Sequence, residues 1–557
     1  MKTILGWIAS VLMHLKMMLI QRRQLRELQQ VAAMPDEHQA QVLLRILQAN
    51  QHTGYGKLNG FESIRTIDEY RRRIPIQTYE ELRPFIERQI ATGETAITST
   101  PALLYAQTSG TTGKPKYVPI LQETINSYRA AQGIFSQAMY RDVPDIFSGK
   151  ILAIVSPAIE GHLDNGIPYG SMSGLVYQNM PPLILSRYVL SPLIFELTDY
   201  DSKYLLIAAF ALAEKRITCI ATANPSTFLR IAGVVESRWD NLIECIEKGS
   251  LEPLALVCSQ SQRQSLSALW KARPRRATQL RALRALRGSP TFADFWPDVR
   301  AAVTWTSGNC ALLLTPLRKL LLPETAIVEM GYLSSEFRGT ITIDCIRNLG
   351  LPTLQDHFFE FSEIALYDKG ERQTLLLGEL EQGKQYYIIV TALHGLYRYF
   401  INDIVEVTGR YQKTPTLRFV QKGKGVTNLS GEKVYESQVI EALQRSSKQL
   451  GVSTDFFIML ADPDDFSYTL YLECAQLTDP QAFEQSAHQT LCLLNLEYAA
   501  KTQSGRVRAL RVKRLRTGTA EVCKAFYLNT GQREGQFKVV TLQYRADMKF
   551  NLEAHVY

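Results

Sequence analysis

The chain has 557 residues, of which 46% are hydrophobic and 21% are charged, and its net charge is +8. This length exceeds what one small hydrophobic core organises, so we expect at least two domains. The composition is that of a folded globular protein and excludes disorder over most of the chain. The small positive excess suits an anionic ligand such as ATP and does not argue for a nucleic-acid partner.

The N-terminal segment is apolar but short. Residues 4–20 read ILGWIASVLMHLKMMLI, which is below the roughly 20 residues that a membrane-spanning helix needs, and His14 and Lys16 interrupt it. No small-residue cleavage site follows it. We interpret residues 4–30 as a helix packed on the first domain. Two alternatives stay open, a helix with weak membrane-surface contact through residues 4–20 and a membrane anchor or signal.

Helices and short apolar strands alternate along most of the chain. An apolar period of helical spacing continues to residue 50, YEELRPFIERQI predicts another helix, and residues 190–290 are mostly helical. Strands are predicted at residues 103–107, 151–157, 301–308, 325–332, 339–345, 357–364 and 385–393, and residues 217–225 predict a strand followed by a turn at Pro225. This alternation predicts an α/β architecture with mixed sheets flanked by helices.

A domain boundary is expected in FVQKGKGVTNLS, residues 419–430, which is polar and rich in Gly and Lys. After it, residues 435–446 and 483–500 predict helices, and residues 455–462, 468–476 and 508–515 predict strands. We therefore expect a large domain over residues 1–420, a hinge over 421–430 and a small, mobile α+β domain over 431–557.

The cysteines, histidines and clustered arginines indicate no disulfide framework, zinc site or nucleic-acid site. The eight cysteines form no CxxC pair and the histidines show no HExxH or HxH spacing, which predicts reduced thiols in a cytoplasmic protein and no zinc site. The run RPRRATQLRALRALRG, residues 273–288, is the densest basic stretch. We interpret it as a solvated helix face, and an anion-binding or membrane-surface role stays open.

The segment TSGTTGKPK, Thr108 to Lys116, follows a predicted strand and carries the main chemical signal. Its glycines let the backbone turn tightly and present N–H groups to an anion, and its hydroxyls and lysines add donors and positive charge. It is not a Walker loop, because Lys114 is followed by Pro115 instead of Ser or Thr. The segment predicts a phosphate-binding loop, and an ordinary Ser/Gly turn is the alternative.

Two further segments carry residues suited to a nucleotide. MGYLSSE, residues 330–336, follows a predicted strand, so it lies where α/β sheets place ligands. Tyr332 can stack on a base and Glu336 can hold Mg²⁺, although a surface turn explains the segment equally well by itself. In YRYFINDIVEV, Asp403 interrupts an apolar strand, where a carboxylate needs a partner. A ribose diol is one such partner, and an ion pair with Arg398 is the alternative.

The set TSGTTGKPK, YLSSE and YRYFINDIVEV, in this order, resembles the adenylate-forming superfamily. With the stretches HFFEFSE and VTNLSGEKVYESQVIEAL, the chain more closely resembles the Gretchen Hagen-type acyl acid amido synthetases, the auxin-responsive promoter family, in its bacterial branch. The resemblance runs from about residue 40 to the C-terminus. Asn402 departs from the glycine that plant members commonly have before the aspartate.

This resemblance implies a set of site residues. It implies that the loop binds the ATP phosphates, that Tyr332 lies by the adenine, that Glu336 binds Mg²⁺ and that Asp403 binds the ribose. Lys433 in LSGEK matches the lysine that approaches the α-phosphate and the carboxylate, and is expected to be catalytic. The full nucleotide-binding set comprises Thr108, Ser109, Gly110, Thr111, Thr112, Tyr332, Asp403 and Phe419. Lys538 resembles the C-terminal lysine of the wider superfamily, and we assign it no role.

The implied reaction activates a carboxylic acid as an acyl-adenylate and transfers the acyl group to an amine, here an amino acid. Two alternatives stay open: an acyl-CoA ligase with a thiol acceptor, and a membrane-peripheral nucleotide-binding protein without catalysis. The acyl pocket is expected to be lined from residues 125–180 and 305–335, and the protein is expected to be a monomer.

Overall fold

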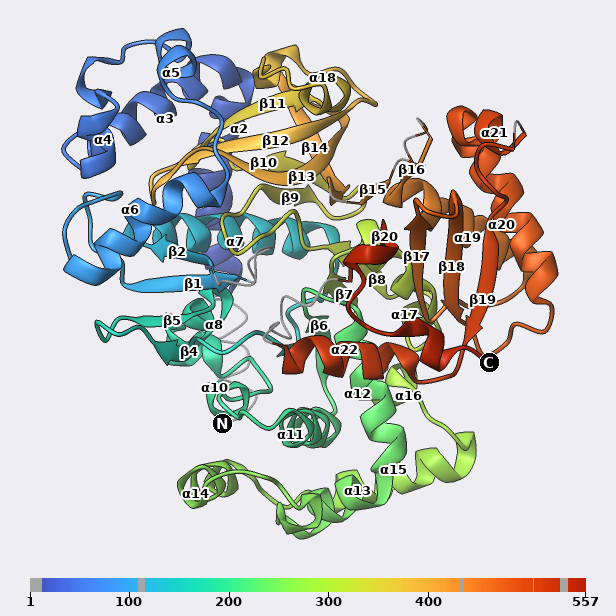
Figure 1. The fold of residues 1–557 in the computed structure, drawn as a ribbon. Coiled ribbons are helices and arrows are strands. Elements are labelled where there is room, and N and C mark those ends of the chain that lie inside the picture. The colour runs from blue at the N-terminus through green and yellow to red at the C-terminus, as the bar shows by residue number, and fades with distance from the viewer. Residues whose placement is uncertain are drawn as a thin grey trace. The chain divides into compact units, whose positions relative to one another are not determined.

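The computed structural model describes the two compact units into which the chain divides (Figure 1). The large unit comprises Met1–Thr306, Leu317–Ile401 and Glu406–Arg418, and the small unit comprises Ser307–Pro316, Asn402–Val405 and Phe419–Tyr557. The residues described are 13–108, 116–423, 425–427, 429–430, 432, 434–503, 505–530 and 539–557.

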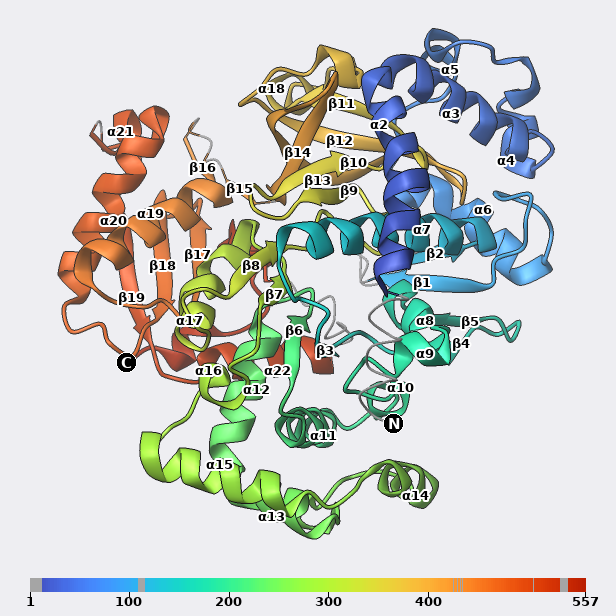
Figure 2. The same cartoon turned by 180° about the vertical axis from the view of Figure 1, so that it is seen from behind.

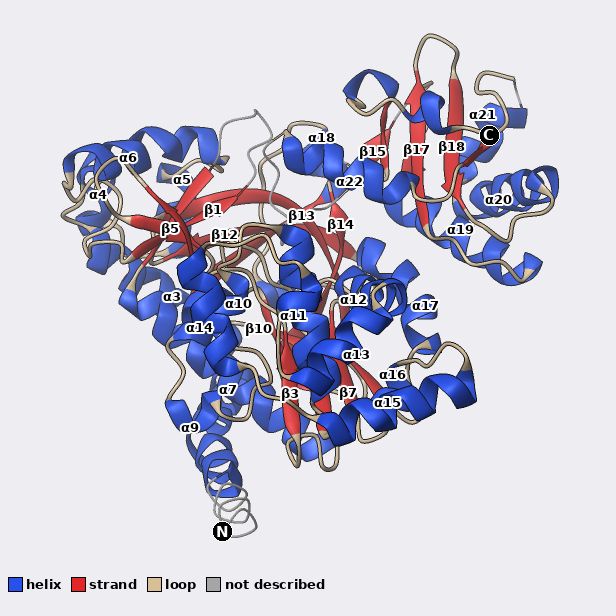
Figure 3. Ribbon diagram, turned by 90° about the horizontal axis from the view of Figure 1, so that it is seen from below, coloured by secondary structure: helices blue, strands red, loops and turns tan. Residues whose placement is uncertain are grey.

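A four-stranded parallel sheet with strand order β3-β6-β7-β8 forms one layer of the large unit. Its strands are β3 (Lys150–Ala153), β6 (Ile217–Ala221), β7 (Ala301–Thr304) and β8 (Ala326–Glu329). All four residues of β7 are buried, as expected for a parallel strand that is covered on both faces. Helix α11 (Tyr200–Ala213) lies over this sheet in the view of Figure 3, and α13 (Trp239–Lys248) packs against α11. The strands predicted for these segments are confirmed, although most end a few residues earlier than predicted.

The other strands of the large unit form three further sheets. One has the order β2-β1-β5-β4, another has the order β11-β12-β13-β14, and β9 and β10 make an antiparallel pair. Their bounds are β1 (Leu104–Thr108), β2 (Lys116–Ile120), β4 (Ile159–His162), β5 (Pro168–Gly170), β9 (Thr340–Asp344), β10 (Leu349–Pro352), β11 (His357–Glu363), β12 (Gln385–Ala392), β13 (Leu396–Tyr411) and β14 (Thr414–Lys422). Short strands such as β4 and β5 escaped prediction, because a few residues show no usable alternation.

Helices of the large unit begin and end at recognisable capping residues. Thr66 caps α5 (Ile67–Arg73) and Thr78 caps α6 (Tyr79–Thr92), each with a Glu at the third helical position completing a capping box. The helix predicted over YEELRPFIERQI is therefore confirmed. The remaining helices are α4 (Gly54–Leu58), α7 (Gln122–Asp142), α8 (Met172–Gln178), α9 (Pro182–Leu185), α10 (Pro192–Phe195), α12 (Ser226–Ser237), α14 (Gln260–Leu269), α15 (Pro274–Arg287), α16 (Phe292–Phe295), α17 (Leu314–Lys319) and α18 (Ile364–Asp368).

The N-terminal region is helical and packs on α7. A helical stretch from residue 13 leads into α2 (Arg26–Ala33) and α3 (Pro35–Asn50), and Figure 2 shows the stretch before α2 crossing α7. Met17 and Ile20 are buried, while Leu15 and Leu19 are about half exposed. Residues 13–33 are helical, and residues 4–12 of the prediction lie outside the described part of the chain. No described helix has both the length and the apolar character to cross a membrane.

The basic run of residues 273–288 contains helix α15, and two of its arginines pair with carboxylates of neighbouring helices. Arg281 bonds Glu247 at 2.6 Å, and Arg284 bonds Glu236 at 3.1 Å. Arg276 instead turns inward and donates to the carbonyls of Leu212 and Phe295. These intramolecular pairs favour the solvated-face interpretation of the run over an anion site.

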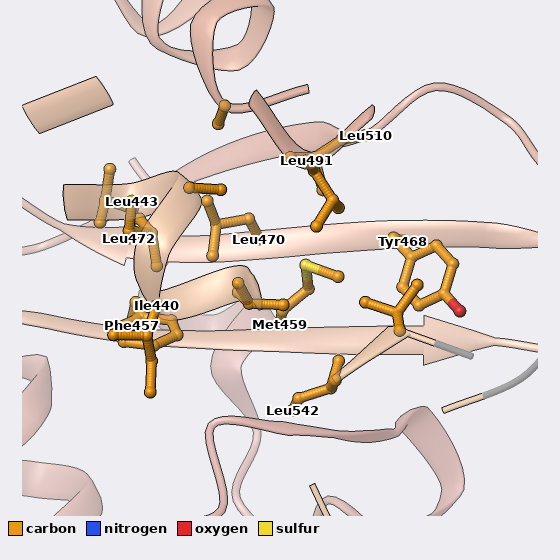
Figure 4. Packing of buried hydrophobic residues seen from close by; sticks show 14 of the residues in the cluster. Ile440, Leu443, Phe457, Met459, Tyr468, Leu470, Leu472, Leu491, Leu510 and Leu542 are labelled. Atoms are coloured by element: carbon orange, nitrogen blue, oxygen red, sulfur yellow. The ribbon is translucent and has the colours of Figure 1, made fainter. Parts of the chain in front are cut away.

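The small unit packs helices against the sheet β19-β18-β17-β20. The strands of this sheet are β17 (Phe456–Asp462), β18 (Ser467–Glu473), β19 (Arg511–Leu515) and β20 (Leu542–Tyr544), and β15 (Val426–Thr427) and β16 (Val434–Tyr435) form a separate pair. The helices of the unit are α19 (Glu436–Leu450), α20 (Pro480–Leu494), α21 (Leu496–Gln503) and α22 (Thr519–Asn529). Figure 4 shows Ile440 and Leu443 of α19 over Phe457, Met459 and Leu470 of the sheet, in one apolar cluster.

The helix predicted over residues 483–500 is wrong as a single helix. The chain leaves the helix at Asn495, whose side chain accepts a hydrogen bond from the amide of Tyr498 at 2.9 Å and so caps α21. The Asn495 amide group also donates to Gln438 on α19. An Asn within an apolar period can serve as a cap, and the tertiary contact with α19 selects that role here.

A buried ion pair joins segments of the large unit that are far apart in the sequence. Arg398, which is 4% exposed, donates from Nε and Nη2 to the two carboxylate oxygens of Glu360 at 2.9 and 3.0 Å. Its remaining nitrogen donates to the carbonyls of Arg71 and Ile74. Arg398 has a φ of +45°, a strained backbone conformation for a residue with a side chain. The contacts of β11, β13 and the α5 region thus converge on one guanidinium.

Replacing Glu360 tests how far the large unit depends on this pair. We expect Glu360→Gln to lower the free energy of unfolding by about 3 kcal/mol or more, because it leaves a buried guanidinium without its counter-charge. Denaturant unfolding of the full chain measures the loss. The exposed pair Glu244–Lys248 provides the control, since Glu244→Gln should change stability by no more than about 0.5 kcal/mol. Equal losses in the two variants would contradict the expectation.

Candidate active site

The Gly-rich segment connects two paired strands. β1 pairs antiparallel with β2, and Thr108 lies opposite Lys116. The predicted phosphate-binding residues between them, Ser109, Gly110, Thr111 and Thr112, lie outside the described residues. A Walker loop joins a strand to a helix, so a connection between two antiparallel strands agrees with the absence of GK[ST]. The predicted strand before the loop is confirmed.

The loop after β8 is held in place by hydrogen bonds to the backbone of Tyr332. The amide of Tyr332 donates to Thr340 Oγ1 at 2.9 Å, and its carbonyl accepts from Gly339 at 2.8 Å. The Tyr332 ring is 7% exposed and meets Phe337 edge to face at 5.6 Å. A Cβ on Gly339 would lie only 2.1 Å from a Tyr332 ring carbon, so this glycine is what lets the ring pack there. Tyr332 is therefore a fixed aromatic surface at the carboxyl end of a parallel sheet.

Glu329, at the end of β8, fixes two loops at once and was missed by the sequence analysis. Its Oε2 accepts from the amide of Thr306 at 2.8 Å and from the Thr306 hydroxyl at 2.5 Å. Its Oε1 accepts from the amide of Gly331 at 2.9 Å. Burial raises the pKa of Glu329, and these donors oppose that rise. The segments that follow β7 and β8 are tied together by one carboxylate.

Glu336, the predicted metal ligand, is nearly buried and is oriented from β13. It is 9% exposed, and the Tyr399 hydroxyl donates to its Oε1 at 3.5 Å. The backbone carbonyl of Glu336 contacts His394 Nε2 at 2.8 Å. Within the described residues, no group of three or more His, Cys, Asp or Glu side chains is placed to hold a metal. A single carboxylate still fits Mg²⁺, which proteins commonly hold through one or two carboxylates together with substrate phosphates.

His394 lies beside a second buried histidine, His357, with ring centroids 6.1 Å apart. Burial lowers the pKa of each ring to about 3, and the mutual repulsion of the two rings adds to the shift for His394. Both rings are therefore neutral at physiological pH. Neither residue was singled out from the sequence, because isolated histidines without ligand spacing give no signal.

Asp403 and its neighbours belong to the small unit. Asp403 is 2% exposed, and its carboxylate lies 2.5 Å from the Lys422 ammonium. The alternative partner considered from the sequence, Arg398, is bound to Glu360 instead. Asn402 has a φ of +62°, and its carbonyl accepts from the amide of Gly423 at 2.8 Å. Asparagine tolerates this left-handed conformation best after glycine, which explains why Asn can stand at this position.

The other two predicted small-unit residues differ in how far they are described. Phe419 is half-buried on β14, close enough to Gly308 that a Cβ there would lie 3.3 Å from its ring. Lys433, the predicted catalytic residue, lies outside the described residues, as does Lys538. Its neighbours Glu432 and Val434 are described, and both are fully buried.

Substitutions at Asn402 test the backbone constraint before Asp403. We expect Asn402→Gly to leave stability nearly unchanged, because glycine adopts a positive φ freely. Asn402→Val should cost about 1–2 kcal/mol, because a β-branched side chain clashes in the left-handed region. Denaturant unfolding of both variants measures the difference. Equal stability of the Gly and Val variants would show that the conformation is not constrained.

The two buried histidines predict a loss of stability in acid. An unfolded histidine titrates near pH 6.5, whereas His357 and His394 titrate at about 3 when folded. The unfolded chain therefore binds more protons between these values, and stability falls as the pH drops from 6.5 towards 3, by up to about 1.4 kcal/mol per pH unit for each histidine. Unfolding at pH 7.5 and 5 should show a shallower loss in His394→Gln. The exposed His52→Gln is the control, and a wild-type slope in His394→Gln would refute this assignment.

Comparison with known proteins gives one consistent result over most of the chain. Models of the GH3 family N-terminal, central and C-terminal domains match residues 24–325, 350–422 and 437–546. Among curated proteins, the putative indole-3-acetic acid-amido synthetase GH3.9 of Arabidopsis thaliana is 23% identical over 550 residues, covering 92% of each chain. The jasmonoyl–L-amino acid synthetase JAR6 of Nicotiana attenuata is 24% identical and covers 90% of each chain.

Solved structures show the same fold. The GH3.15 acyl acid amido synthetase superposes with a TM-score of 0.82 at 21% identity and covers 96% of each chain. A 2-hydroxyisobutyryl-CoA ligase in complex with its acyl-adenylate superposes with a TM-score of 0.54 at 11% identity, covering 91% of this chain and 89% of the other. The predicted α/β fold, an adenylate-forming N-terminal domain followed by a smaller C-terminal domain, is confirmed. The chain belongs to the GH3 family.

Proposed function

We propose that this protein is an ATP-dependent acyl acid amido synthetase, a ligase that joins a carboxylic acid to an amino acid. The observation that carries this proposal is the family match over residues 24–325, 350–422 and 437–546. Relatives that cover about nine-tenths of the chain are named as synthetases of indole-3-acetic acid amides and jasmonoyl amino acids. The curated relatives are 22–24% identical to the chain.

The reaction has two balanced steps. A carboxylate oxygen of the acid attacks the α-phosphorus of ATP, and the bond to the β-phosphate oxygen breaks, which releases pyrophosphate. The amine then attacks the acyl carbon, loses a proton and displaces AMP. Because the anhydride already supplies a good leaving group, the protein's task is to place the reactants and to stabilise charge.

In the large unit, we assign the phosphates of ATP to Thr108 and the segment that follows it. The fixed, nearly buried ring of Tyr332 supports an assignment beside the adenine. Glu336 would hold Mg²⁺, which supplies positive charge to the phosphates when bound. The contact from Tyr399 supports this assignment, because it orients the Glu336 carboxylate.

In the small unit, we assign Asp403 to the ribose hydroxyls, Phe419 to the nucleotide and Lys433 to the α-phosphate. The Asp403 carboxylate is buried and already bound to Lys422, so ribose hydroxyls would share it with that ammonium. A lysine ammonium at the reaction centre offsets the negative charge that builds when a carboxylate attacks a phosphate.

ATP–pyrophosphate exchange across a panel of carboxylic acids tests the first step. We expect exchange that depends on one class of acid, followed by amide formation when amino acids are screened as acceptors. A product that requires CoA and ignores amino acids would overturn the amide assignment in favour of a CoA ligase. Absence of both exchange and ATP binding would favour a protein without catalysis.

Replacing Lys433 tests the catalytic assignment. We expect Lys433→Ala to lower the exchange rate by about 100-fold or more, while ATP binding measured by calorimetry stays within about threefold, because the ammonium acts mainly in the transition state. The exposed Lys248→Ala on α13 is the matched control and should exchange at the wild-type rate. Near-normal exchange in Lys433→Ala would show that another cation serves this step.

A further inference from the structure

The residue before Lys433 is a fully buried carboxylate with four hydrogen bonds. Glu432 Oε1 accepts from the amide of Leu429 at 2.9 Å and from the Tyr468 hydroxyl at 2.8 Å. Glu432 Oε2 accepts from the amide of Ser430 at 2.8 Å and from its hydroxyl at 3.1 Å. Three of these donors come from the segment that leads to Lys433, and the fourth comes from the core of the small unit.

Tyr468 provides the rigid end of this connection. It lies on β18, a central strand of the sheet β19-β18-β17-β20, and Figure 4 shows its ring among the buried residues of that core. The ring is fully buried and packs edge to face on Tyr498 at 5.7 Å. Thr427 also donates to the Tyr468 hydroxyl, at 3.3 Å. One phenol therefore fastens both Thr427 and Glu432 to the sheet.

The residue after Lys433 is anchored independently. Val434 is fully buried and pairs with Thr427 in the short antiparallel ladder of β15 and β16. Two positions further along the chain, Glu436 accepts from both the amide and the hydroxyl of Thr541, beside β20. The residues on both sides of position 433 are thus fixed to the same sheet.

Glu432 remains a carboxylate in this setting. Burial acts to raise the pKa of Glu432, but the amides of Leu429 and Ser430 and the Tyr468 hydroxyl outweigh it, so the pKa is lowered. Each oxygen already accepts two hydrogen bonds, which leaves no free position from which Glu432 could take a proton from a substrate amine. Glu432 therefore serves as an anchor that holds Leu429 and Ser430 to Tyr468, since charge-assisted hydrogen bonds are stronger than neutral ones.

We propose that Glu432, held by Tyr468, is a positioning residue that sets where Lys433 is presented for adenylation. This inference rests on the proposed function, because it takes Lys433 to be the lysine of that step. Loss of the anchor would move the ammonium without removing it, and a displacement of about 1 Å from productive geometry can cost about 100-fold in rate.

A buried carboxylate could instead serve only the stability of the small unit, and Glu473 offers a matched control for that reading. Glu473 lies on the same strand as Tyr468 and is 5% exposed. Its oxygens accept from the amides of Gly518 and Ala520, at the start of α22. Glu473 is therefore another buried carboxylate of the small unit that binds backbone amides. None of its described hydrogen bonds reaches the segment before Lys433.

The test compares Glu432→Gln, Glu432→Asp, Tyr468→Phe and Glu473→Gln in the full chain. Glutamine sets an NH₂ group against a backbone N–H, so both Gln variants should lower the melting temperature. We expect Glu432→Gln to reduce kcat for ATP–pyrophosphate exchange by about 10–100-fold with KM for ATP within about threefold. Tyr468→Phe should show a smaller loss, and Glu432→Asp should recover part of the rate. Glu473→Gln should keep kcat within about threefold of the wild type.

Equal kcat in Glu432→Gln and Glu473→Gln, or an effect of Glu432→Gln on KM alone, would overturn the inference. If Glu432→Gln does not fold, Tyr468→Phe carries the same comparison, and an unchanged kcat there overturns it.

A second readout separates this inference from the proposed function. An amine-reactive reagent labels Lys433 at a rate that mass spectrometry measures without substrate. We expect Glu432→Gln to change the labelling rate and its pH dependence by about threefold or more, and Glu473→Gln to leave both unchanged. Wild-type labelling in Glu432→Gln would overturn the inference. Exchange that fails in the wild type, or that survives in Lys433→Ala, would reject the proposed function while the labelling still tests the anchor.

Discussion

The geometry of the candidate site in the large unit depends on one carboxylate at the end of a parallel strand. Glu329 closes β8 and accepts hydrogen bonds from Thr306, which follows β7, and from Gly331, which follows β8. Parallel strands deliver their connecting loops to the same edge, and neighbouring strands leave these loops with unpaired amides. A single acceptor between them satisfies both loops and fixes the start of the segment that carries Tyr332 and Glu336.

The small unit uses the same physical device. Glu432, Glu436 and Glu473 each accept hydrogen bonds from backbone amides that no sheet or helix partner satisfies. Burying a charge is costly, but a carboxylate that receives several N–H and O–H donors recovers that cost and holds the loop in one arrangement. The described residues that donate to these carboxylates are therefore held to the rest of the small unit.

The large unit contains a different constraint, a buried arginine that binds three segments. Arg398 binds Glu360 and two carbonyls from the α5 region, and it adopts a positive φ to do so. Four residues later, Asn402 repeats the positive φ just before Asp403. Both residues lie within β13, as does Tyr399, whose hydroxyl contacts Glu336. The family comparison agrees with this arrangement at the level of the fold, since the GH3.15 enzyme superposes over 96% of the chain.

The fold class, most of the strands and helices, and the positions that suit a nucleotide could all be predicted from the amino-acid sequence. These features follow from local periodicity and from motifs in which neighbouring residues carry the signal. The sequence also indicated that Asp403 needs a partner, because a carboxylate in an apolar strand is costly.

The identity of that partner depends on the fold, which pairs Asp403 with Lys422 and Arg398 with Glu360. The fold likewise ended α20 at Asn495, paired His357 with His394, and gave Glu329 and Glu432 their donors. Each of these outcomes depends on residues that the fold brings together or on unpaired amides in loops. Local pattern carries no information about such contacts, because the competing partners differ in space and not in sequence spacing.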